Sequence, residues 1–260
     1  MPKLCANLSM LFTEVDFLDR FELAAEAGFT GVEYWFPYEF NASDIKQRLA
    51  ANNLQQVLFN LPAGDWAAGE RGIACHPNRV KEFYAGVDSA IEYAVKLDCK
   101  QCNVLAGVKS YDVSEQQARA TFTANLKYAS DAFKQAGIKL LIESINTFDI
   151  PNFFLTNTEQ ALELIAEVGS DNLFYQYDIY HMQRMEGDLC ATIHNNLAHI
   201  AHIQLADNPG RGEPGTGEID FSTLLNNIDN MNYHGWIGAE YNPSTATLDS
   251  LNWAKPWIKQ

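Results

Sequence analysis

The stretch "GWIGAEYNP", residues 235–243, joins a short apolar run to a glutamate, Glu240, near its far end. A short apolar run bounded by turn residues is typical of a strand buried on both faces. An ionised carboxylate is costly in such an interior unless it is paired, binds a metal ion or lies at a solvent-filled opening. The fold must therefore explain both where this strand lies and what compensates the charge of Glu240.

Seven further apolar runs resemble this one, and amphipathic segments such as 77–97 and 114–137 lie between the runs. The strand candidates are residues 3–10, 31–36, 55–61, 101–107, 139–145, 173–180, 202–207 and 235–241. Such alternation is typical of βα units on a parallel sheet. Eight units in about 250 residues predict a single-domain (β/α)8 TIM barrel over residues 1–260. A doubly wound open sheet is the alternative, but it does not need eight such regular repeats.

Composition and charge limit the classes of molecule that the protein is expected to bind. The 260-residue chain is 47% hydrophobic, which suffices for a large core, and no linker-like segment divides it. Its 33 acidic and 18 basic residues give a net charge of −15, which repels nucleic acid and anionic membranes. The N-terminal stretch has no small-residue cleavage site, so we expect no signal peptide, and no apolar run is long enough to span a membrane. We therefore expect a cytoplasmic protein that binds small solutes. The sequence does not decide whether the protein forms a homo-oligomer.

The five cysteines do not suggest a disulfide framework, because their number is odd and they are scattered. Cys99 and Cys102 form one C-x-x-C pair, but no second pair follows. We expect buried free thiols rather than a zinc or redox site.

Polar side chains occur near the ends of four successive strand candidates. They are Glu143, Asp178, Gln204 and Glu240. In a TIM barrel the carboxyl ends of the strands meet at the functional face, so these side chains should converge, with Gly238 leaving room beneath Glu240. Three adjacent carboxylates repel one another unless a cation compensates them. The pattern predicts a Mg²⁺ or Mn²⁺ site formed by these four residues, and loop-orienting polar residues are the alternative.

Two long loops are expected at the same face. "GRGEPG", residues 210–215, matches a dinucleotide-binding pattern, but its acidic residue, its proline and the lack of a helix at the third glycine indicate a loop over the barrel mouth. The loop after the third strand carries Arg71, which we expect to bind an anionic substrate unless it pairs with Glu70 at the surface. His181 is a candidate for orienting substrate, and His202 for supporting the site from one layer deeper.

The chain resembles the hydroxypyruvate isomerase and 2-oxo-tetronate isomerase family of xylose-isomerase-like TIM barrels. The segments that carry the resemblance run nearly end to end: "ANLSMLF", "GVEYWFPY", "FNLPAGDWAAGERGIA", "YDIYHMQRMEGDL" and "HIQLADNPGRGEPGTGEI". The resemblance implies interconversion of hydroxypyruvate and tartronate semialdehyde, with Glu143 and Glu240 as the acid/base pair. It also implies a cation held by those two glutamates together with Asp178 and Gln204.

Physical chemistry is consistent with that activity. Removal of a proton beside a ketone leaves an enediolate, whose charge a cation bound to the substrate oxygens stabilises. One carboxylate can take the proton from carbon three while another returns a proton to carbon two. The alternatives are a 2-oxo-tetronate isomerase or ketose epimerase with a larger pocket, and more remotely a metal-dependent DNA-repair endonuclease. Pocket size is expected to depend on aromatic residues, namely Trp35, Phe36, Trp66 and Phe148.

Overall fold

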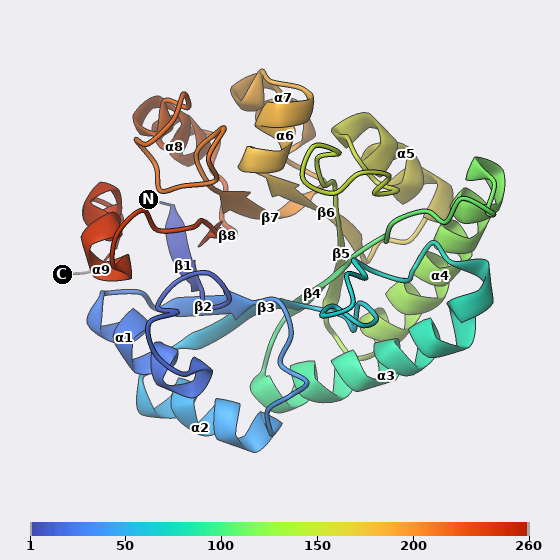
Figure 1. The fold of residues 1–260 in the computed structure, drawn as a ribbon, viewed down its shortest axis with the longest axis horizontal. Helices are drawn as coiled ribbons and strands as arrows, with labels where there is room; N and C mark the ends of the chain where they lie inside the picture. The colour runs from blue at the N-terminus through green and yellow to red at the C-terminus, as the bar shows by residue number, and fades with distance from the viewer. Residues whose placement is uncertain (1, 259–260) are drawn as a thin grey trace.

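The computed structural model describes residues 2–258, which form one closed barrel of eight parallel strands surrounded by helices (Figure 1). The strands follow one another around the barrel in chain order, and β8 pairs with β1 to close it. They are β1 (Lys3–Asn7), β2 (Gly31–Tyr34), β3 (Gln55–Asn60), β4 (Gln101–Val104), β5 (Lys139–Glu143), β6 (Leu173–Asp178), β7 (Ile200–Leu205) and β8 (Trp236–Ala239). The predicted TIM barrel is confirmed.

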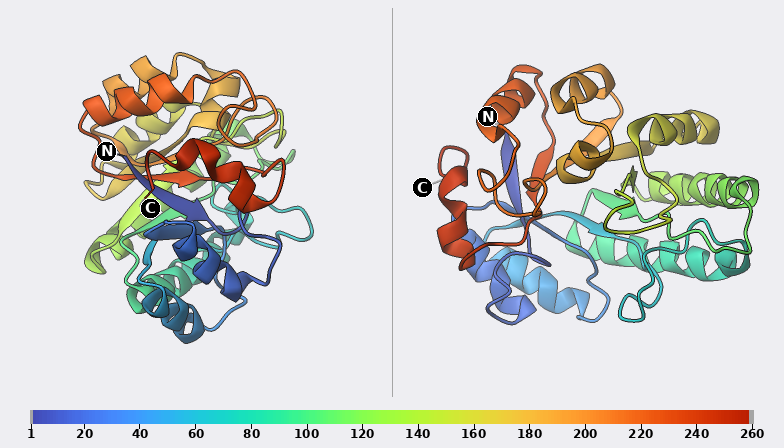
Figure 2. Two further views of the ribbon diagram at one scale, coloured as in Figure 1. Left: turned by 90° about the vertical axis from the view of Figure 1, so that its left-hand side faces the viewer. Right: turned by 45° about the horizontal axis from the view of Figure 1, so that its top comes forward.

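Helices cover the outside of the barrel, as the two further views in Figure 2 show. They are α1 (Arg20–Glu26), α2 (Ala42–Ala51), α3 (Val80–Leu97), α4 (Glu115–Gln135), α5 (Thr158–Val168), α6 (Ile179–Met185), α7 (Leu189–Asn196), α8 (Phe221–Asn230) and α9 (Thr247–Ser250). The 3₁₀ turns are η1 (Phe17–Asp19), η2 (Pro77–Arg79) and η3 (Leu251–Ala254). None of the described helices is long and apolar enough to cross a membrane.

The ends of the helices follow from local sequence. Ser114 and Gln117 form a capping box at the start of α4, so two backbone N–H groups gain acceptors. Asn157 caps α5, which ends at Gly169 in a left-handed conformation (φ 67°) that glycine adopts without strain. Pro77 opens a 3₁₀ turn before α3, so the predicted helix begins there with tighter geometry.

The sixth strand is shorter than the predicted 173–180. It ends at Asp178, whose side chain accepts a hydrogen bond from the backbone N–H of His181 and so caps α6. Ile179 and Tyr180 are therefore helical, because the cap supplies the acceptor that starts a helix immediately after the strand. This early start brings His181 back toward the carboxyl end of the barrel.

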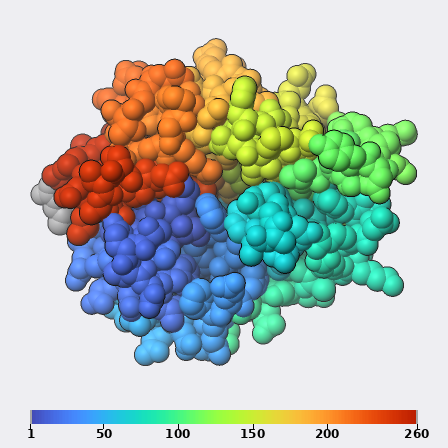
Figure 3. All heavy atoms as spheres, in the orientation of Figure 1, coloured from blue at the N-terminus to red at the C-terminus, as the bar shows by residue number. Residues whose placement is uncertain are grey.

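The core lies in two places, outside the barrel beneath the helices and inside the barrel. The inner apolar group contains Cys5, Val57, Leu58 and Leu141. Cys99 and Cys102 are buried free thiols, as expected, and the other described cysteines are also free. In Figure 3 the first and last segments of the chain, blue and red, lie side by side, in agreement with the pairing of β1 and β8.

Candidate active site

The four predicted polar side chains converge at the carboxyl ends of adjacent strands. Glu143 and Asp178 are the last residues of β5 and β6, Gln204 lies on β7, and Glu240 directly follows β8. Strand register places Asp178 opposite Gln204, and Gln204 opposite Gly238. All four side chains belong to buried residues, with at most 5% of the residue surface exposed. The location expected from the sequence is therefore observed.

A partly open cavity of about 280 Å³ lies above three of these residues, Glu143, Gln204 and Glu240, and Asp178 is not part of its lining. Its volume is near the lower end of the roughly 300–1,000 Å³ that is usual for small-molecule sites. The lining is Asn7, Tyr34, Trp35, Leu58, Asn60, Trp66, Arg71, Leu105, Glu143, Ile145, Ile150, Gln176, His181, Gln204, Arg211 and Glu240. The cavity combines two glutamates, two arginines and several amides, which suits a small, polar, anionic ligand.

Glu143 is held by an amide from the neighbouring strand. The Asn103 Nδ2 atom donates to Glu143 Oε2 over 2.8 Å and to Asn60 Oδ1 over 3.1 Å. This bond fixes Oε2, one of the two carboxylate oxygens of Glu143. Glu143 can therefore present one oxygen to a ligand without losing its support.

Glu240 is held by an indole and a guanidinium. Trp35 Nε1 and Arg211 Nη2 each donate to Glu240 Oε1 over 2.9 Å. Arg211 also lies over the ring of Tyr180, with 5.2 Å between the guanidinium carbon and the ring centroid. The charge partner of Glu240 in this structure is therefore Arg211.

Asp178 and His181 form the third part of the site. Asp178 Oδ2 lies 3.8 Å from His181 Nε2. The Asn146 Nδ2 atom lies 2.6 Å from His181 Nδ1, and Asn146 Oδ1 accepts two backbone N–H bonds, so Nδ2 is the donor. His181 Nδ1 is consequently an acceptor and Nε2 carries the hydrogen. Burial, followed by the charge of Arg211, holds the pKa of His181 well below its usual value, so the ring is neutral.

Burial and mutual repulsion shift all three carboxylates in the same direction. Burial, then the charges of Glu240 and Asp178, raises the pKa of Glu143 well above its usual value. Burial also raises the pKa of Glu240 to about 8, with Asp178 and Glu33 adding to the shift and Arg211 opposing it. The pKa of Asp178 is raised mainly by burial, again against Arg211. The site therefore holds more acidic groups than the guanidinium of Arg211 compensates.

The donors present fit a hard divalent cation. One ligand atom from each of Glu143, Asp178 and His181 lies within 4.8 Å of the others. Because His181 Nε2 carries a hydrogen, the oxygen atoms of the carboxylates and of Gln204 are the better ligands, and oxygen ligands are those that Mg²⁺ and Mn²⁺ prefer. In this structure Glu240 instead contacts Trp35 and Arg211.

Arg71 lies at the cavity, on the long loop after β3. Its Nη1 atom donates to the backbone oxygens of Trp66 (3.0 Å) and Glu70 (2.7 Å), and its guanidinium stacks 4.1 Å from the Trp66 ring centroid. The Glu70 carboxylate pairs with Arg79 instead, so the alternative of a surface salt bridge between Arg71 and Glu70 is not observed. Arg71 therefore stays available to an anion in the cavity.

The glycine-rich loop 210–215 carries Arg211, a site residue that was not predicted from the sequence. The loop is organised by Asp207, whose Oδ2 atom accepts the N–H groups of Gly215 (2.8 Å) and Gly217 (2.9 Å). A side chain at Gly217 would overlap the backbone oxygen of Asn208 and the Asp207 carboxylate, which explains this glycine. The backbone N–H groups that would bind a phosphate in a nucleotide site thus bind an internal carboxylate, and the loop positions an arginine. The available signal was a basic residue in the loop beside three acidic strand ends.

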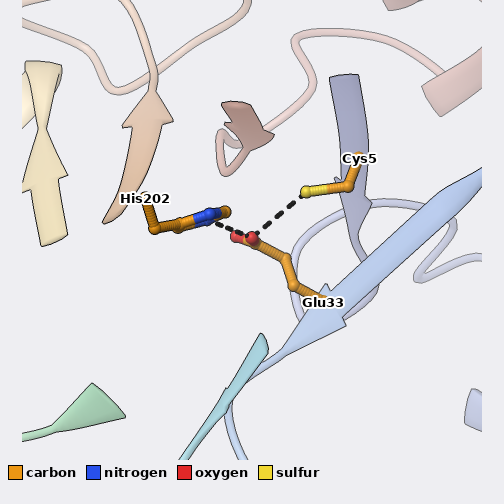
Figure 4. Close-up of side chains that lie close together, drawn as sticks. All are labelled: Cys5, Glu33 and His202. Atoms are coloured by element: carbon orange, nitrogen blue, oxygen red, sulfur yellow. Dashed lines mark hydrogen bonds and ion pairs between the residues drawn. The ribbon is translucent and has the colours of Figure 1, made fainter. Parts of the chain in front are cut away.

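A second buried carboxylate, Glu33 on β2, lies one layer below the cavity and was also missed. Figure 4 shows Cys5 and His202 pointing at it from β1 and β7. His202 Nε2 lies 2.6 Å from Glu33 Oε2, and Gln204 Nε2 donates to Oε1 over 2.8 Å. The room beneath Glu240 that Gly238 was expected to provide is occupied by this carboxylate, which any side chain at 238 would overlap.

The aromatic walls differ in part from the prediction. Trp35 and Trp66 line the cavity, but Phe36 and Phe148 do not. Phe36 packs against Trp66 from outside, with ring centroids 5.0 Å apart. Phe148 is 66% exposed and lies under Arg184, because the turn after β5 directs it to the surface. The expectation that Phe36 and Phe148 set the pocket size is therefore wrong.

Comparison with known proteins adds the family context. The sequence profile described as "Xylose isomerase-like TIM barrel" matches residues 21–257. The hydroxypyruvate isomerase of Escherichia coli (strain K12) is 54% identical over 257 residues, covering 99% of this chain and 100% of that protein. The 2-oxo-tetronate isomerase of Pectobacterium atrosepticum is 44% identical over 260 residues, covering 100% and 99%.

Solved structures show the same fold. A crystal structure named "AP endonuclease, family 2" from Brucella melitensis superposes with a TM-score of 0.97 at 42% identity, and the match covers all of both chains. The 3-keto-D-glucoside 4-epimerase of E. coli reaches a TM-score of 0.82 at 21% identity, covering 98% of this chain and 100% of that one.

Proposed function

The chain belongs to the xylose isomerase-like TIM-barrel family and is an isomerase, and we propose that it interconverts hydroxypyruvate and 2-hydroxy-3-oxopropanoate (tartronate semialdehyde). The observation that carries the proposal is the placement of Glu143 and Glu240 in one cavity that Arg71 and Arg211 also line. Two carboxylates supply the acid/base pair of an isomerisation, and two guanidinium groups suit an anionic substrate. The 54% identical relative from E. coli carries the same activity in its name.

The proton transfers are assigned to Glu143 and Glu240. The reaction removes a proton from carbon three of hydroxypyruvate, forms an enediolate, and adds a proton to carbon two while a proton moves between the two oxygens. Both glutamates have raised pKa values, Glu240 at about 8, which brings them close to neutral pH, where acid/base catalysis is efficient. Which of the two acts first in the forward direction depends on how the substrate lies between them.

The developing charge is stabilised by groups that the cavity already contains. The His181 Nε2–H group is a neutral donor at the cavity wall, suited to a substrate oxygen that gains charge. Arg71 and Arg211 are assigned to the substrate carboxylate. A Mg²⁺ or Mn²⁺ ion held by Glu143, Asp178, Gln204 and Glu240 would supply further charge stabilisation when bound.

The second candidate is a 2-oxo-tetronate isomerase, favoured by the 44% identical relative. It would use the same acid/base pair on a substrate one carbon longer. The two candidates are separated by initial rates with hydroxypyruvate and with 2-oxo acids of four to six carbons, followed by proton NMR. Our proposal requires the highest kcat/KM with hydroxypyruvate. A higher value with a four-carbon acid would move the assignment to that substrate.

An endonuclease activity, suggested by the name of the Brucella structure, is disfavoured by charge. A net charge of −15 and two glutamates in the cavity repel a DNA backbone. Incubation with a duplex that contains an abasic site, with Mg²⁺ or Mn²⁺ at low salt, should leave the duplex uncut. Cleavage that Glu143→Gln abolishes would overturn the isomerase assignment.

A further inference from the structure

Gln176 on β6 lines the cavity, and its side-chain amide is not fully hydrogen-bonded. The residue is 1% exposed, and its Oε1 atom has no hydrogen-bond partner among residues 2–258. A buried amide oxygen without a donor has lost its hydrogen bonds to water and gained none in return, which is destabilising. Such an atom at the wall of a binding cavity indicates that the ligand completes the bond.

A chain of hydrogen bonds fixes which end of the Gln176 amide is free. It begins at the Glu33 carboxylate, which can only accept when ionised. Gln204 Nε2 donates to Glu33 Oε1 over 2.8 Å, so Gln204 Oε1 points the other way. That oxygen accepts a bond from Gln176 Nε2 over 2.6 Å.

The direction of this chain cannot be reversed without loss. Turning the Gln204 amide would set its oxygen against the Glu33 carboxylate, and turning Gln176 would set two oxygens against each other. Glu33 is itself held in place by Asn7 Nδ2 at 3.0 Å and by His202 Nε2 at 2.6 Å (Figure 4 shows the latter). The free end of the chain is therefore an acceptor, which a hydrogen-bond donor completes.

The chemistry of a hydroxy-oxo acid supplies one such donor. At neutral pH the carboxylate and ketone of hydroxypyruvate only accept, and its hydroxymethyl group carries its one O–H. We propose that Gln176 is a substrate-binding residue whose side-chain oxygen accepts a hydrogen bond from the carbon-three hydroxyl of the substrate. This assignment rests on the proposed function and adds a specificity determinant to it.

Gln56 offers a matched control. It is also a buried glutamine on a barrel strand, 2% exposed, and its Oε1 atom also lacks a partner among the described residues. It lies near the amino end of β3 and does not line the site cavity. Replacement of either glutamine by methionine removes a similar amide, but only Gln176→Met removes the proposed contact.

The test uses glycerate and lactate, which are not substrates of the isomerisation and differ in the carbon-three hydroxyl. Their inhibition constants against hydroxypyruvate turnover are measured for wild type, Gln176→Met, Gln176→Asn and Gln56→Met. A neutral hydrogen bond of about 0.5–1.5 kcal/mol predicts that wild type prefers glycerate by roughly 2- to 12-fold. In Gln176→Met the ratio should fall to about 1, and Gln176→Asn, whose oxygen is withdrawn by one methylene, should lower it too. In Gln56→Met the ratio should be retained.

Each other outcome is decisive. If Gln176→Met weakens both inhibitors equally, or leaves the ratio unchanged, Gln176 has only a structural role and the inference is wrong. It is also wrong if wild type turns over hydroxypyruvate but does not prefer glycerate. If wild type neither turns over hydroxypyruvate nor binds these acids, the proposed function itself fails, and this inference fails with it. Thermal melting of each variant identifies a fold defect, and Gln176→Asn keeps the test valid if Gln176→Met does not fold.

Discussion

Glu33 and Glu240 are two buried glutamates one layer apart in the same barrel, yet their protonation behaviour is opposite. Burial alone would raise the pKa of both. His202, Gln204 and Asn7 overcome burial at Glu33 and lower its pKa below the usual value. At Glu240, burial and the nearby Asp178 outweigh Arg211, and the pKa rises to about 8.

The difference lies in the donors. The Glu33 carboxylate accepts hydrogen bonds from four side chains, those of Cys5, Asn7, His202 and Gln204. Glu240 accepts from Trp35 and Arg211, both through the same oxygen. We call Glu33 with its four donors the lower layer, and the carboxyl groups of Glu143, Asp178 and Glu240 the upper layer. The hydrogen bonds of the lower layer are complete without a ligand, whereas the upper layer needs a ligand or a cation to compensate its carboxyl groups. Function is therefore expected in the upper layer and rigidity in the lower one.

The strongest test of this contrast removes the acid/base groups. Glu143→Gln and Glu240→Gln should each lower kcat by at least about 10²- to 10⁴-fold, the usual contribution of a positioned acid or base. Neither should lower the melting temperature, because each replaces a buried carboxyl group, crowded by other carboxyl groups, with a neutral amide of the same shape. Rates are measured by proton NMR and stability by thermal unfolding, with the surface variant Glu163→Gln as control. Retained activity in either variant would remove that glutamate from the mechanism.

Replacement of Arg211 should give the next largest effect on activity. Arg211→Gln breaks the 2.9 Å contact with Glu240 and removes a proposed carboxylate contact. Charge-assisted hydrogen bonds contribute about 1.5–3 kcal/mol, so kcat/KM should fall by roughly 10- to 150-fold, mainly through KM. Arg211→Lys keeps the charge but not the planar fork and should recover part of the loss. An unchanged KM in Arg211→Gln would show that the substrate carboxylate binds elsewhere.

In the lower layer a substitution should affect stability first. Glu33→Gln places an N–H group against donors that the carboxylate now satisfies. The free energy of unfolding should fall by about 1–3 kcal/mol, the cost of unsatisfied buried polar groups. Urea unfolding measures the loss, and Gln56→Met serves as a control in the same barrel. No change in the urea midpoint would mean that the Glu33 contacts do not contribute to stability.

The two layers should also respond to pH with opposite sign. In chelator-treated protein, Glu240 binds a proton more tightly when folded, so its contribution to stability is present below about pH 4.5 and is lost as the pH rises to about 8. Glu33 has a lowered pKa, so its contribution is present above about pH 4.5 and is lost as the pH falls. Melting temperatures from pH 3 to 9 for wild type, Glu240→Gln and Glu33→Gln should separate the two slopes. Identical profiles for the two variants would contradict the contrast.

The smallest effect is expected outside the barrel. Arg119 on α4 pairs with Glu163 and Glu167 on α5, but all three side chains are at least 36% exposed. Such pairs contribute about 0–1 kcal/mol, so Arg119→Ala should change the free energy of unfolding by less than about 1 kcal/mol and leave kcat unchanged. A larger loss of stability would show that surface pairs matter here as much as the buried layers.

The sequence predicted the barrel and the upper layer because both follow from local pattern. Apolar runs identify the strands, and parallel strands bring Glu143, Asp178, Gln204 and Glu240 to one face. Glu33 was missed, because its partners come from β1 and β7 and meet it only once the barrel closes. Arg211 was missed because a loop conformation, set by Asp207, decides where its side chain lies. Neither the closure of the barrel nor that loop conformation leaves a periodic signal in the sequence.

The most direct test of the proton-transfer account is the position of deuterium after turnover of hydroxypyruvate in heavy water. If Glu143 and Glu240 act as separate base and acid, carbon two of the product receives its hydrogen from a carboxyl group that exchanges with solvent. The account therefore predicts nearly complete deuterium at carbon two, seen by NMR at low conversion. If carbon two of the product instead carries only hydrogen that came from carbon three of the substrate, the hydrogen has moved directly, as in a hydride shift. That result would contradict the two-carboxylate mechanism.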